Sequence, residues 1–443
     1  MNRETIIQFG TGRFLRGFFD YFINCLNQQG LYDGRIVVIQ STPGGAAERI
    51  NAQNGVYHLV LRGIENGKAM EECHRITSIS RALNPESDFD GFLKLAENPA
   101  MRVIISNTTE IGIQFDATAS FDDRPPKAYP AKLCRLLHHR FQSGLPGFLI
   151  FPCELIDHNA DVLRSAVLEH ARRWKLGEGF IRWIETENRF CNTLVDRICT
   201  GFPAEEAEQW EKKLGGPDAL LNTAEPFHLW AVEGNYEEEL PFRKAGLNVV
   251  WTDDITPYKL RKVRILNGGH TSMVLGASLF GLETVLECMQ DETVHRLFRR
   301  CVFEEIVPTL GENEETLAFA CSVEERFQNP YIRHHLADIA VNSVSKFKVR
   351  VLPTIREYEK MFHLQPHGLL FSLAALLAFY RLREPNDRAE YIHVLKEAPL
   401  SAILADTAVW GEDLSRYYDI VAPYYNAILQ NGMKAAYQMV LEK

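Results

Sequence analysis

The first forty residues constrain the fold of this chain most strongly. Residues 6–9 are a short apolar run that ends at Gly10, and apolar residues recur at helical spacing over residues 13–28 before Gly30. Residues 35–40 form a continuous apolar run, which is typical of a strand buried on both faces of a parallel sheet. Strand, helix and strand in this order predict a βαβ unit.

Two more apolar runs, at residues 101–106 and 148–151, predict buried strands. Segments 57–62 and 69–80 flank Asn66-Gly67, and such a pair between alternating segments predicts a hairpin because both turn residues need a positive φ. Strands that alternate with helices indicate a doubly wound α/β fold.

After residue 245 the periodicity becomes mainly helical. We therefore predict two domains, an α/β domain with a parallel sheet at residues 1–245 and a mainly α-helical domain at residues 246–443. The predicted helices of the second domain are residues 267–279, 291–305, 315–327, 331–346, 368–382 and 415–441.

The composition narrows the class of protein. The formal net charge of the 443 residues is −10, and the chain has no dense block of Lys and Arg, so a nucleic-acid partner is not expected. The nine cysteines include no C-x-x-C pair, which favours a reducing compartment. The N-terminus lacks the pattern of a signal peptide, and the longest apolar stretch, residues 368–380, is too short to cross a bilayer. We expect a cytoplasmic protein without a membrane partner.

Gly10-Thr11-Gly12 lies between the first predicted strand and the first predicted helix, where a backbone must approach a pyrophosphate closely. Leu15 replaces the third glycine of the G-x-G-x-x-G pattern, and a tight turn without a ligand remains the alternative. The position within a βαβ unit favours a dinucleotide. The candidate cofactor-binding residues of this segment are Ile7, Phe9, Gly10, Thr11, Gly12, Arg13 and Phe14.

Two later strand ends belong to the same predicted crevice, because ligands of doubly wound sheets bind at the carboxyl ends of the strands. The second strand ends at Gln40, which can bind a ribose hydroxyl but does not repel a 2′-phosphate, so this position leaves NAD and NADP both open. Polar residues follow the strand at 101–106, although a capped turn is the alternative interpretation. They are Asn107, Thr108, Thr109 and Glu110.

Residues 262–270, KVRILNGGH, carry the candidate chemistry. On a helix at about 100° per residue, Lys262, Asn267 and His270 share a sector of roughly 140° and can converge on one point. Gly268 and Gly269 allow a ligand or a neighbouring backbone to come close. The alternative from spacing alone is a helix start with a core histidine.

The pattern K-x-x-x-x-N-x-x-H resembles the signature of the mannitol dehydrogenase family, the polyol-specific long-chain dehydrogenases. The likeness extends in order over nearly the whole chain and is closest to members that act on open-chain sugar acids. The other segments that carry it are residues 7–12, 106–110, 129–133, 152–157, 192–198, 225–227, 254–259, 326–330, 345–346 and 431–433. The resemblance implies a Rossmann domain followed by a helical domain, and an NAD-dependent oxidoreductase that reduces a keto group without a metal.

The resemblance also implies residue roles. Lys262 matches the general acid/base, Asn267 and Asn192 match the pair of amides that stabilises the developing alkoxide, and His270 matches a residue that orients the substrate. Lys346 matches a substrate-binding lysine. The remaining substrate-binding candidates are Arg197, Glu225 and Lys259.

One position departs from the family pattern. Polyol-specific members have an arginine eight residues before the substrate lysine, and Asp338 stands there in this chain. This disfavours mannitol and leaves open which cation pairs with a sugar-acid carboxylate. Other open-chain sugar acids, polyols and sugar phosphates remain alternative substrates, and a non-catalytic nucleotide sensor is a remote alternative. We expect a small-molecule substrate and either a monomer or a small homo-oligomer.

Overall fold

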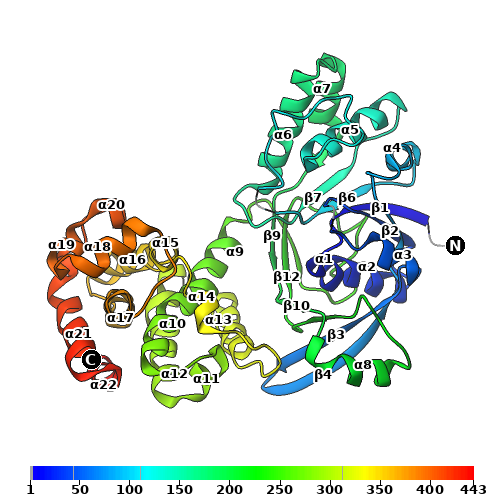
Figure 1. Cartoon of the computed structure of the whole chain (residues 1–443). Coiled ribbons are helices and arrows are strands. Elements are labelled where there is room, and N and C mark those ends of the chain that lie inside the picture. The colour runs from blue at the N-terminus through cyan, green and yellow to red at the C-terminus, as the bar shows by residue number, and fades with distance from the viewer. Residues whose placement is uncertain (1–2, 43, 110, 312) are drawn as a thin grey trace. The chain divides into compact units, whose positions relative to one another are not determined.

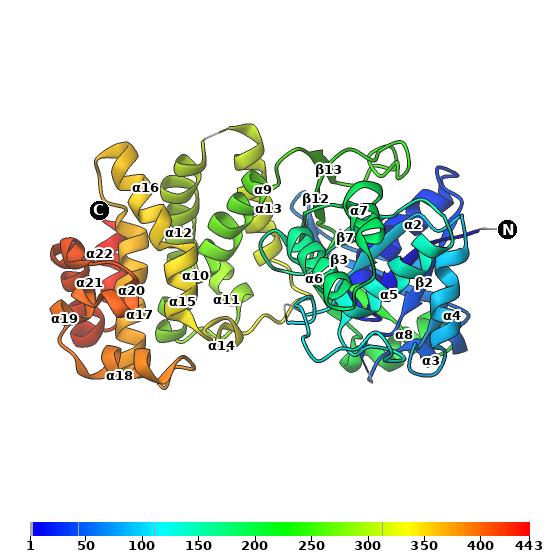
Figure 2. The ribbon, with the colours of Figure 1, turned by 90° about the horizontal axis from the view of Figure 1, so that it is seen from above.

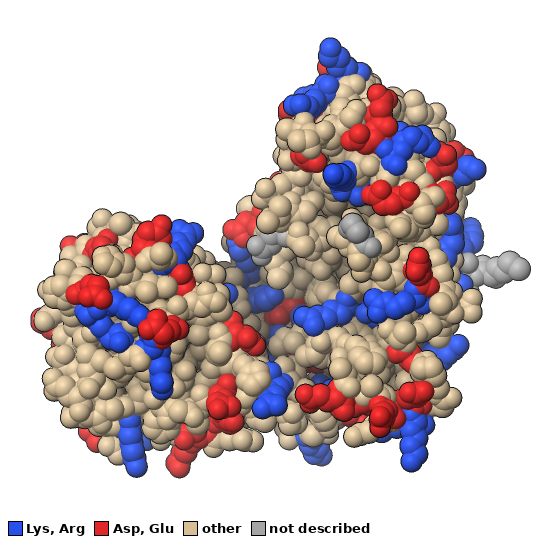
Figure 3. Space-filling view, viewed as in Figure 1, with Lys and Arg blue, Asp and Glu red and all other residues tan. Residues whose placement is uncertain are grey.

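The computed structural model describes residues 3–42, 44–109, 111–311 and 313–443. These residues divide into two compact units. Unit 1 comprises residues 1–62 and 70–256, and unit 2 comprises residues 63–69 and 257–443. None of the described helices is long and apolar enough to span a membrane. On the face that Figure 3 shows, acidic and basic side chains are interspersed over both units.

Unit 1 is built on a six-stranded sheet (Figure 1) in which every recorded pair of neighbours is parallel. The strand order β5-β2-β1-β6-β7-β8 reproduces the Rossmann order 3-2-1-4-5-6. This confirms the predicted fold class. The strands are β1 (Arg3–Phe9), β2 (Gly34–Ile39), β5 (Ile79–Leu83), β6 (Val103–Ser106), β7 (Leu149–Pro152) and β8 (Arg189–Phe190).

The apolar runs of the sequence are continuous because both faces of this sheet are covered. Ile6 and Val38 belong to one hydrophobic cluster, while Ile7 and Val37 belong to another, as expected for side chains that alternate between faces. The helices of unit 1 are α1 (Arg13–Gly17), α2 (Phe19–Gln28), α3 (Ala47–Ala52), α4 (Phe89–Lys94), α5 (Tyr129–Gln142), α6 (Asn159–Arg173), α7 (Glu178–Glu187) and α8 (Ala207–Leu214).

The helix predicted over residues 13–28 is broken at Phe18, which has φ −128° and ψ −87°. Tertiary contacts account for the break. The Tyr57 hydroxyl donates a 2.5 Å hydrogen bond to the Arg16 carbonyl. Gly17 lies so close to Cys199 that a Cβ would be 2.7 Å from its Sγ. Such contacts leave no trace in the helical spacing of the sequence.

Two smaller sheets complete unit 1, except that the tip of the hairpin in one of them, residues 63–69, belongs to unit 2. The predicted hairpin is confirmed, since β3 (Tyr57–Glu65) and β4 (Lys68–Ile76) flank Asn66 and Gly67 at φ 52° and 72°. The four-stranded sheet also contains β10 (Cys199–Gly201) and β11 (Asn222–Ala224), and the three-stranded sheet has the order β13-β12-β9. Its strands are β9 (Thr193–Asp196), β12 (Leu229–Glu233) and β13 (Val249–Thr252).

Unit 2 is mainly helical (Figure 2), and the almost fully buried α17 packs against α10 and α21. Its helices begin with α9 (Thr256–Arg261), whose first residue belongs to unit 1. The others are α10 (Gly268–Phe280), α11 (Val285–Gln290), α12 (Glu292–Arg299), α13 (Glu314–Phe327), α14 (Leu336–Ile339), α15 (Ser343–Arg350), α16 (Leu352–Phe362), α17 (His367–Leu382), α18 (Ala389–Glu397), α19 (Leu400–Ala405), α20 (Thr407–Trp410), α21 (Tyr418–Asn431) and α22 (Met433–Leu441).

Two helices predicted as single segments are interrupted where a residue takes a positive φ. Asn342 at φ 56° separates α14 from α15, so residues 331–346 do not form one helix. Gly432 at φ 79° separates α21 from α22. Apolar spacing continues through both breaks, which explains why periodicity alone missed them.

Candidate functional site

The first part of the candidate site is the turn between β1 and α1. Gly10 has φ 121°, and a Cβ on it would lie 3.0 Å from the main-chain oxygen of Asn107. Only glycine fits both conditions. Gly12 is different, because its φ is −70° and a Cβ would meet nothing within 4 Å. Its backbone is therefore open to an approaching ligand.

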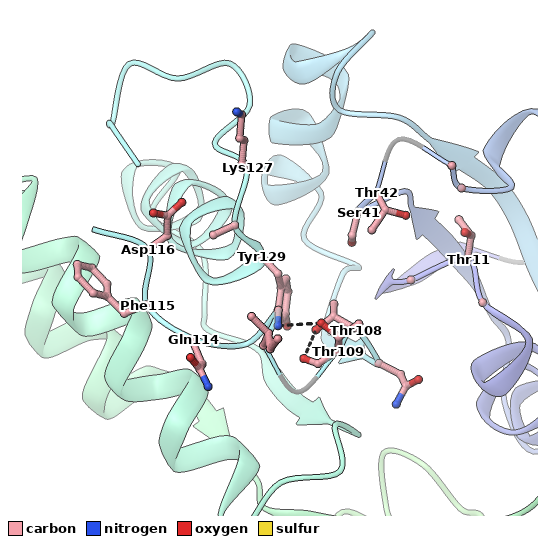
Figure 4. Close-up of a pocket in the computed structure, with 18 residues that line it drawn as sticks. Thr11, Ser41, Thr42, Thr108, Thr109, Gln114, Phe115, Asp116, Lys127 and Tyr129 are labelled. Carbon is pink, nitrogen blue, oxygen red and sulfur yellow. Dashed lines mark hydrogen bonds between the residues drawn. The ribbon is translucent and has the colours of Figure 1, made fainter. Parts of the chain in front are cut away.

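This turn borders a pocket of about 720 Å³ within unit 1. Six of the predicted cofactor residues line it, namely Gly10, Thr11, Gly12, Asn107, Thr108 and Thr109. In Figure 4, Thr11, Ser41 and Thr42 lie on one side of the pocket, and Gln114, Phe115 and Asp116 lie on the other. Glu110 lies outside the described residues. The volume falls in the range of small-molecule and cofactor sites.

Five predicted cofactor residues do not line this pocket. Ile7 and Phe9 are fully buried in the sheet core. Phe14 stacks on Phe18, with ring centroids 5.0 Å apart. Arg13 donates a 3.0 Å hydrogen bond to the Thr200 carbonyl. These side chains support the turn or pack beneath it.

Gln40 is the fifth of these residues. Its side chain is 8% exposed, and its Oε1 accepts a 3.1 Å hydrogen bond from the amide of Ala47 at the start of α3. The side chain thus caps a helix. The residues that follow β2 and line the pocket are Ser41, Thr42, Gly44 and Gly45, which the sequence analysis missed.

A second missed group lines the opposite wall of the pocket: Ile111, Gly112, Gln114, Phe115, Asp116, Lys127, Ala128 and Tyr129. Most of these residues belong to segment 111–128, which is described throughout and forms neither helix nor strand. Its position depends on tertiary contacts, such as the 3.1 Å hydrogen bond from the Trp174 indole to the Ala119 carbonyl. The one available signal was Tyr129, which begins a predicted family segment.

Glu154 holds the Ser106–Thr109 loop in place. It is 3% exposed and accepts hydrogen bonds from the Thr108 amide at 2.9 Å, the Thr108 hydroxyl at 3.0 Å and the Ser106 hydroxyl at 3.2 Å. Burial raises the pKa of this carboxyl, and the hydrogen bonds oppose that effect. Asn107 is fixed by a 2.7 Å bond from its Nδ2 to the Cys153 carbonyl. The pocket wall is therefore pre-organised.

The second part of the candidate site is in unit 2, where residues Lys262–Asn267 form a π-helical segment. In the α-helix predicted for this segment, Lys262 and Asn267 would point about 140° apart. The i→i+5 hydrogen bonding of a π-helix widens the turn and instead brings residues five apart closer to the same face. His270 follows three residues later in α10, on the adjacent turn. The local geometry therefore aligns the three side chains better than the predicted helix.

Gly268 and Gly269 explain how this segment is fixed. A Cβ on Gly268 would lie 3.2 Å from the Arg350 main-chain oxygen, so α15 approaches the start of α10 closely. A Cβ on Gly269 would lie 3.0 Å from Phe298 Cε2 and 3.2 Å from Val302 Cγ2. Gly268 admits a neighbouring backbone, one of the two interpretations that the sequence left open, whereas Gly269 admits two neighbouring side chains.

Gly269→Ala tests how tightly this helix is packed. Alanine raises helix propensity by up to about 1 kcal/mol, but overpacking costs roughly 1–3 kcal/mol. We expect a net loss of about 1–2 kcal/mol in the free energy of unfolding, measured by denaturant titration. A variant more stable than wild type would show that Phe298 and Val302 yield freely and that the packing argument is wrong.

His270 is 6% exposed and stacks face to face on Phe327, with ring centroids 3.9 Å apart and planes 10° apart. The His334 ring meets it edge-on at 5.1 Å. Burial and the nearby charges of His334, Arg326, Arg350 and Lys346 hold the pKa of His270 well below its usual value. The imidazole is therefore neutral at neutral pH, and within the described residues its buried Nε2 has no hydrogen-bond partner.

Asn192, the other predicted amide, lies in unit 1 and is 5% exposed. Its Nδ2 donates to Asp161 at 3.0 Å and to Glu233 at 2.9 Å. Its Oδ1 accepts a 2.9 Å bond from the Ala160 amide in the first turn of α6. Both amide hydrogens are engaged with carboxylates in this structure.

Arg197 and Glu225 are buried in unit 1. Arg197 donates from Nε to the Glu225 carbonyl at 2.8 Å and from Nη1 to the Gly17 carbonyl at 3.0 Å. Glu225 accepts a 2.6 Å bond from the Ile198 amide. Arg197 is 6% exposed and Glu225 is 1% exposed, and the printed hydrogen bonds of both join segments of unit 1.

The other substrate candidates lie in unit 2. Lys259 is partly exposed on α9. Lys346 is partly buried on α15 and donates a 2.8 Å bond to the Ile339 carbonyl. Asp338, at the position where the family has an arginine, is exposed on α14. Among the described residues, no group of three or more His, Cys, Asp or Glu side chains is arranged to hold a metal ion.

Comparison with known proteins identifies the family. The model of the mannitol dehydrogenase Rossmann domain matches residues 4–243, and the model of the mannitol dehydrogenase C-terminal domain matches residues 254–430. Altronate oxidoreductase from Bacillus subtilis (strain 168) is 41% identical over 453 residues, covering 98% of this chain and 94% of the relative. The Escherichia coli O1:K1 / APEC protein of the same name is 42% identical over 463 residues, covering 98% and 96%.

Two solved structures share the fold. Substrate-free D-sorbitol dehydrogenase has a TM-score of 0.86 at 24% identity and covers 98% of this chain and 95% of its own. The ternary complex of Pseudomonas fluorescens mannitol 2-dehydrogenase with NAD and D-mannitol has a TM-score of 0.75 at 24% identity, covering 100% and 95%. The matches to the two domain models and to the full-length relatives show that the chain belongs to the mannitol dehydrogenase family and is a nicotinamide-dependent dehydrogenase that acts on CH–OH groups.

Proposed function

We propose that this enzyme reduces D-tagaturonate to D-altronate with NADH, reversibly and without a metal. The observation that carries the proposal is full-length similarity, at 41–42% identity, to two proteins named altronate oxidoreductase. The Lys262–His270 segment supports the same reaction class, because the spacing of Lys262, Asn267 and His270 in a π-helical turn continued by α10 favours a common face for the three side chains.

The pocket of unit 1 fits a dinucleotide. A Cβ on Gly10 would meet the Asn107 carbonyl, whereas the space beside Gly12 is open to a pyrophosphate. Thr11, Ser41, Thr42, Thr108 and Thr109 add hydroxyl groups to the lining. NAD is the proposed cofactor, and the fold it shares with an NAD-bound relative supports this choice. A bound nicotinamide would supply the hydride that reduces the substrate's carbonyl carbon.

Side chains of the protein would donate the proton and the hydrogen bonds to the substrate's carbonyl oxygen. In the proposed mechanism, the Lys262 ammonium donates its proton to the carbonyl oxygen as the C=O bond becomes C–O, and it regains a proton from solvent. The Asn267 amide donates a hydrogen bond to the developing alkoxide. Neutral His270 is a hydrogen-bond donor or acceptor for a substrate hydroxyl. Asn192 can join the alkoxide only by exchanging one of its present bonds to Asp161 or Glu233.

A substrate panel tests the proposal. Tagaturonate, fructuronate and fructose would each be assayed with NADH and with NADPH, following the absorbance of the reduced nicotinamide. We expect kcat/KM to be at least about tenfold higher for tagaturonate than for the other two, with NADH as the better donor. A preference for fructuronate or fructose would assign a different substrate, and NADH binding without any turnover would point to a nucleotide sensor.

A further inference from the structure

The cation that binds a sugar-acid carboxylate is not assigned by the family pattern, because Asp338 stands at the arginine position. We propose that Arg350, together with Lys346, forms a carboxylate-binding pair in unit 2 that selects sugar acids over neutral ketoses. This inference rests on the proposed function and concerns the carboxylate end of the same substrate.

Lys346 and Arg350 lie on a helix that contacts the candidate chemistry. Lys346 and Arg350 are four residues apart on α15, so their side chains emerge on the same face of the helix. Helix α15 packs against both the Lys262–Asn267 segment and α10. Arg350 Nη1 lies 3.4 Å from the Thr271 hydroxyl, next to His270 in sequence. The two cations therefore lie beside the face that carries the candidate chemistry.

Three other arginines of unit 2 already have a carboxylate partner. Arg264 makes a two-point contact with Glu357, at 3.2 Å for each nitrogen. Arg261 lies 3.3 Å from Glu315, and Arg300 lies 3.3 Å from Glu305. In contrast, no carboxylate among the described residues lies within the 4.0 Å salt-bridge limit of Arg350 or Lys346. Arg350 thus lacks the carboxylate partner that these three arginines have.

The electrostatics around Arg350 and Lys346 also favour an anion. Burial lowers the pKa of Arg350, and burial together with the Arg350 charge lowers the pKa of Lys346. The same two cations disfavour protonation of His270. Asp387 also influences Lys346, but its carboxylate already accepts bonds from the Val344 amide and the Tyr380 hydroxyl. Partly buried positive charge without a protein counter-ion favours an anionic ligand.

The ligand chemistry fits a carboxylate. A guanidinium presents two parallel N–H donors that match both carboxylate oxygens, while an ammonium supplies a point charge. A neutral hydroxymethyl group at the same end of the substrate would leave both cations unpaired. The pair would thus discriminate between a keto acid and the ketose of the same carbon chain.

Arg350→Gln tests the inference, because glutamine removes the charge and can keep a hydrogen bond to Thr271. We expect kcat/KM for tagaturonate to fall about 100-fold, which corresponds to about 2.8 kcal/mol, mainly through KM, because a charge-assisted hydrogen bond to the carboxylate is lost. For tagatose, which has a hydroxymethyl group in place of the carboxylate, kcat/KM should change less than about threefold. Arg350→Lys should recover part of the loss, since it restores charge without the two-point geometry.

Lys348→Gln is the matched control on the same helix. Lys348 lies on the opposite side of α15 from the pair, with its ammonium 5.9 Å from the centre of the Tyr391 ring. Its variant should behave as wild type with both substrates. An equal fall for tagaturonate and tagatose in Arg350→Gln, or no fall for tagaturonate, would overturn the carboxylate assignment.

A binding measurement separates this inference from the proposed function. In the presence of NAD, altronate should raise the thermal unfolding temperature of wild type but not of Arg350→Gln, while the neutral polyol altritol should give the same small shift in both. If wild type does not reduce tagaturonate, the proposed function fails. Arg350-dependent stabilisation by altronate, mannonate or gluconate would still support the anion site, and stabilisation by none of them would overturn it.

Discussion

Replacing Lys262 by methionine is expected to lower kcat by about a thousandfold while leaving the Kd for NADH unchanged. Proton transfer by a positioned side chain contributes about 10²–10⁴-fold, so a loss near the middle of this range corresponds to roughly 4 kcal/mol of transition-state stabilisation. NADH binding should survive because the pocket proposed for the dinucleotide is lined by residues of unit 1. Stopped-flow turnover and fluorescence titration of NADH would measure the two quantities.

Lys262→Arg distinguishes a proton donor from a fixed positive charge. An arginine side chain remains protonated in proteins, so it would keep the charge but could not give up a proton near neutral pH. We expect Lys262→Arg to be as inactive as Lys262→Met, and Lys348→Met, a lysine change on another helix of unit 2, to keep full activity. Near-normal kcat in the arginine variant would mean that position 262 acts only by electrostatic stabilisation.

The sequence predicted the architecture of unit 1 because the governing signals are local. Apolar runs mark strands buried on both faces, and Ile6 and Ile7 indeed pack in opposite hydrophobic clusters. Asn66-Gly67 predicted the hairpin turn between β3 and β4 because both residues tolerate the positive φ that this turn requires. The position of Gly10, Thr11 and Gly12 after the first strand was sufficient to place them at the pocket.

Other features could not be predicted because they depend on contacts between distant segments. The helix break at Phe18 follows from contacts with Tyr57 and Cys199. The sequence also did not show that the side-chain oxygen of Gln40, predicted to bind the ribose, accepts a hydrogen bond from the Ala47 amide at the start of α3. The pocket wall formed by residues 111–128 has no periodicity from which to infer its course.

In unit 2, too, the periodicity of the sequence predicted some features and missed others. Helical spacing located α10, α13 and α17 closely, yet it could not show that residues Lys262–Asn267 are π-helical. Both forms of helix present apolar residues at short intervals, and only the hydrogen-bond pattern separates them. The difference matters because it decides whether Lys262 and Asn267 share a face. The positive φ of Asn342 was equally invisible, although it sets the direction of the helix that carries Lys346 and Arg350.

Gly10 and Gly12 should respond differently to alanine, although both belong to the same turn. Gly10→Ala forces a side chain into φ 121° and within 3.0 Å of the Asn107 carbonyl. Backbone strain of this kind costs about 1–3 kcal/mol, so unit 1 should lose roughly 2–10 °C in unfolding temperature without any ligand. Its affinity for NADH should fall as well, because the Asn107 loop must move away from the pocket.

Gly12→Ala should leave the unliganded protein within about 1 kcal/mol of wild type, since its Cβ meets no atom within 4 Å and its φ of −70° suits any residue. The added methyl group would occupy the space into which a pyrophosphate must come, and we expect the Kd for NADH to rise at least about tenfold. Calorimetric melting and NADH titration on both variants would separate strain from ligand exclusion. If Gly12→Ala bound NADH as wild type does, the dinucleotide would have to approach the pocket by a route that avoids this turn.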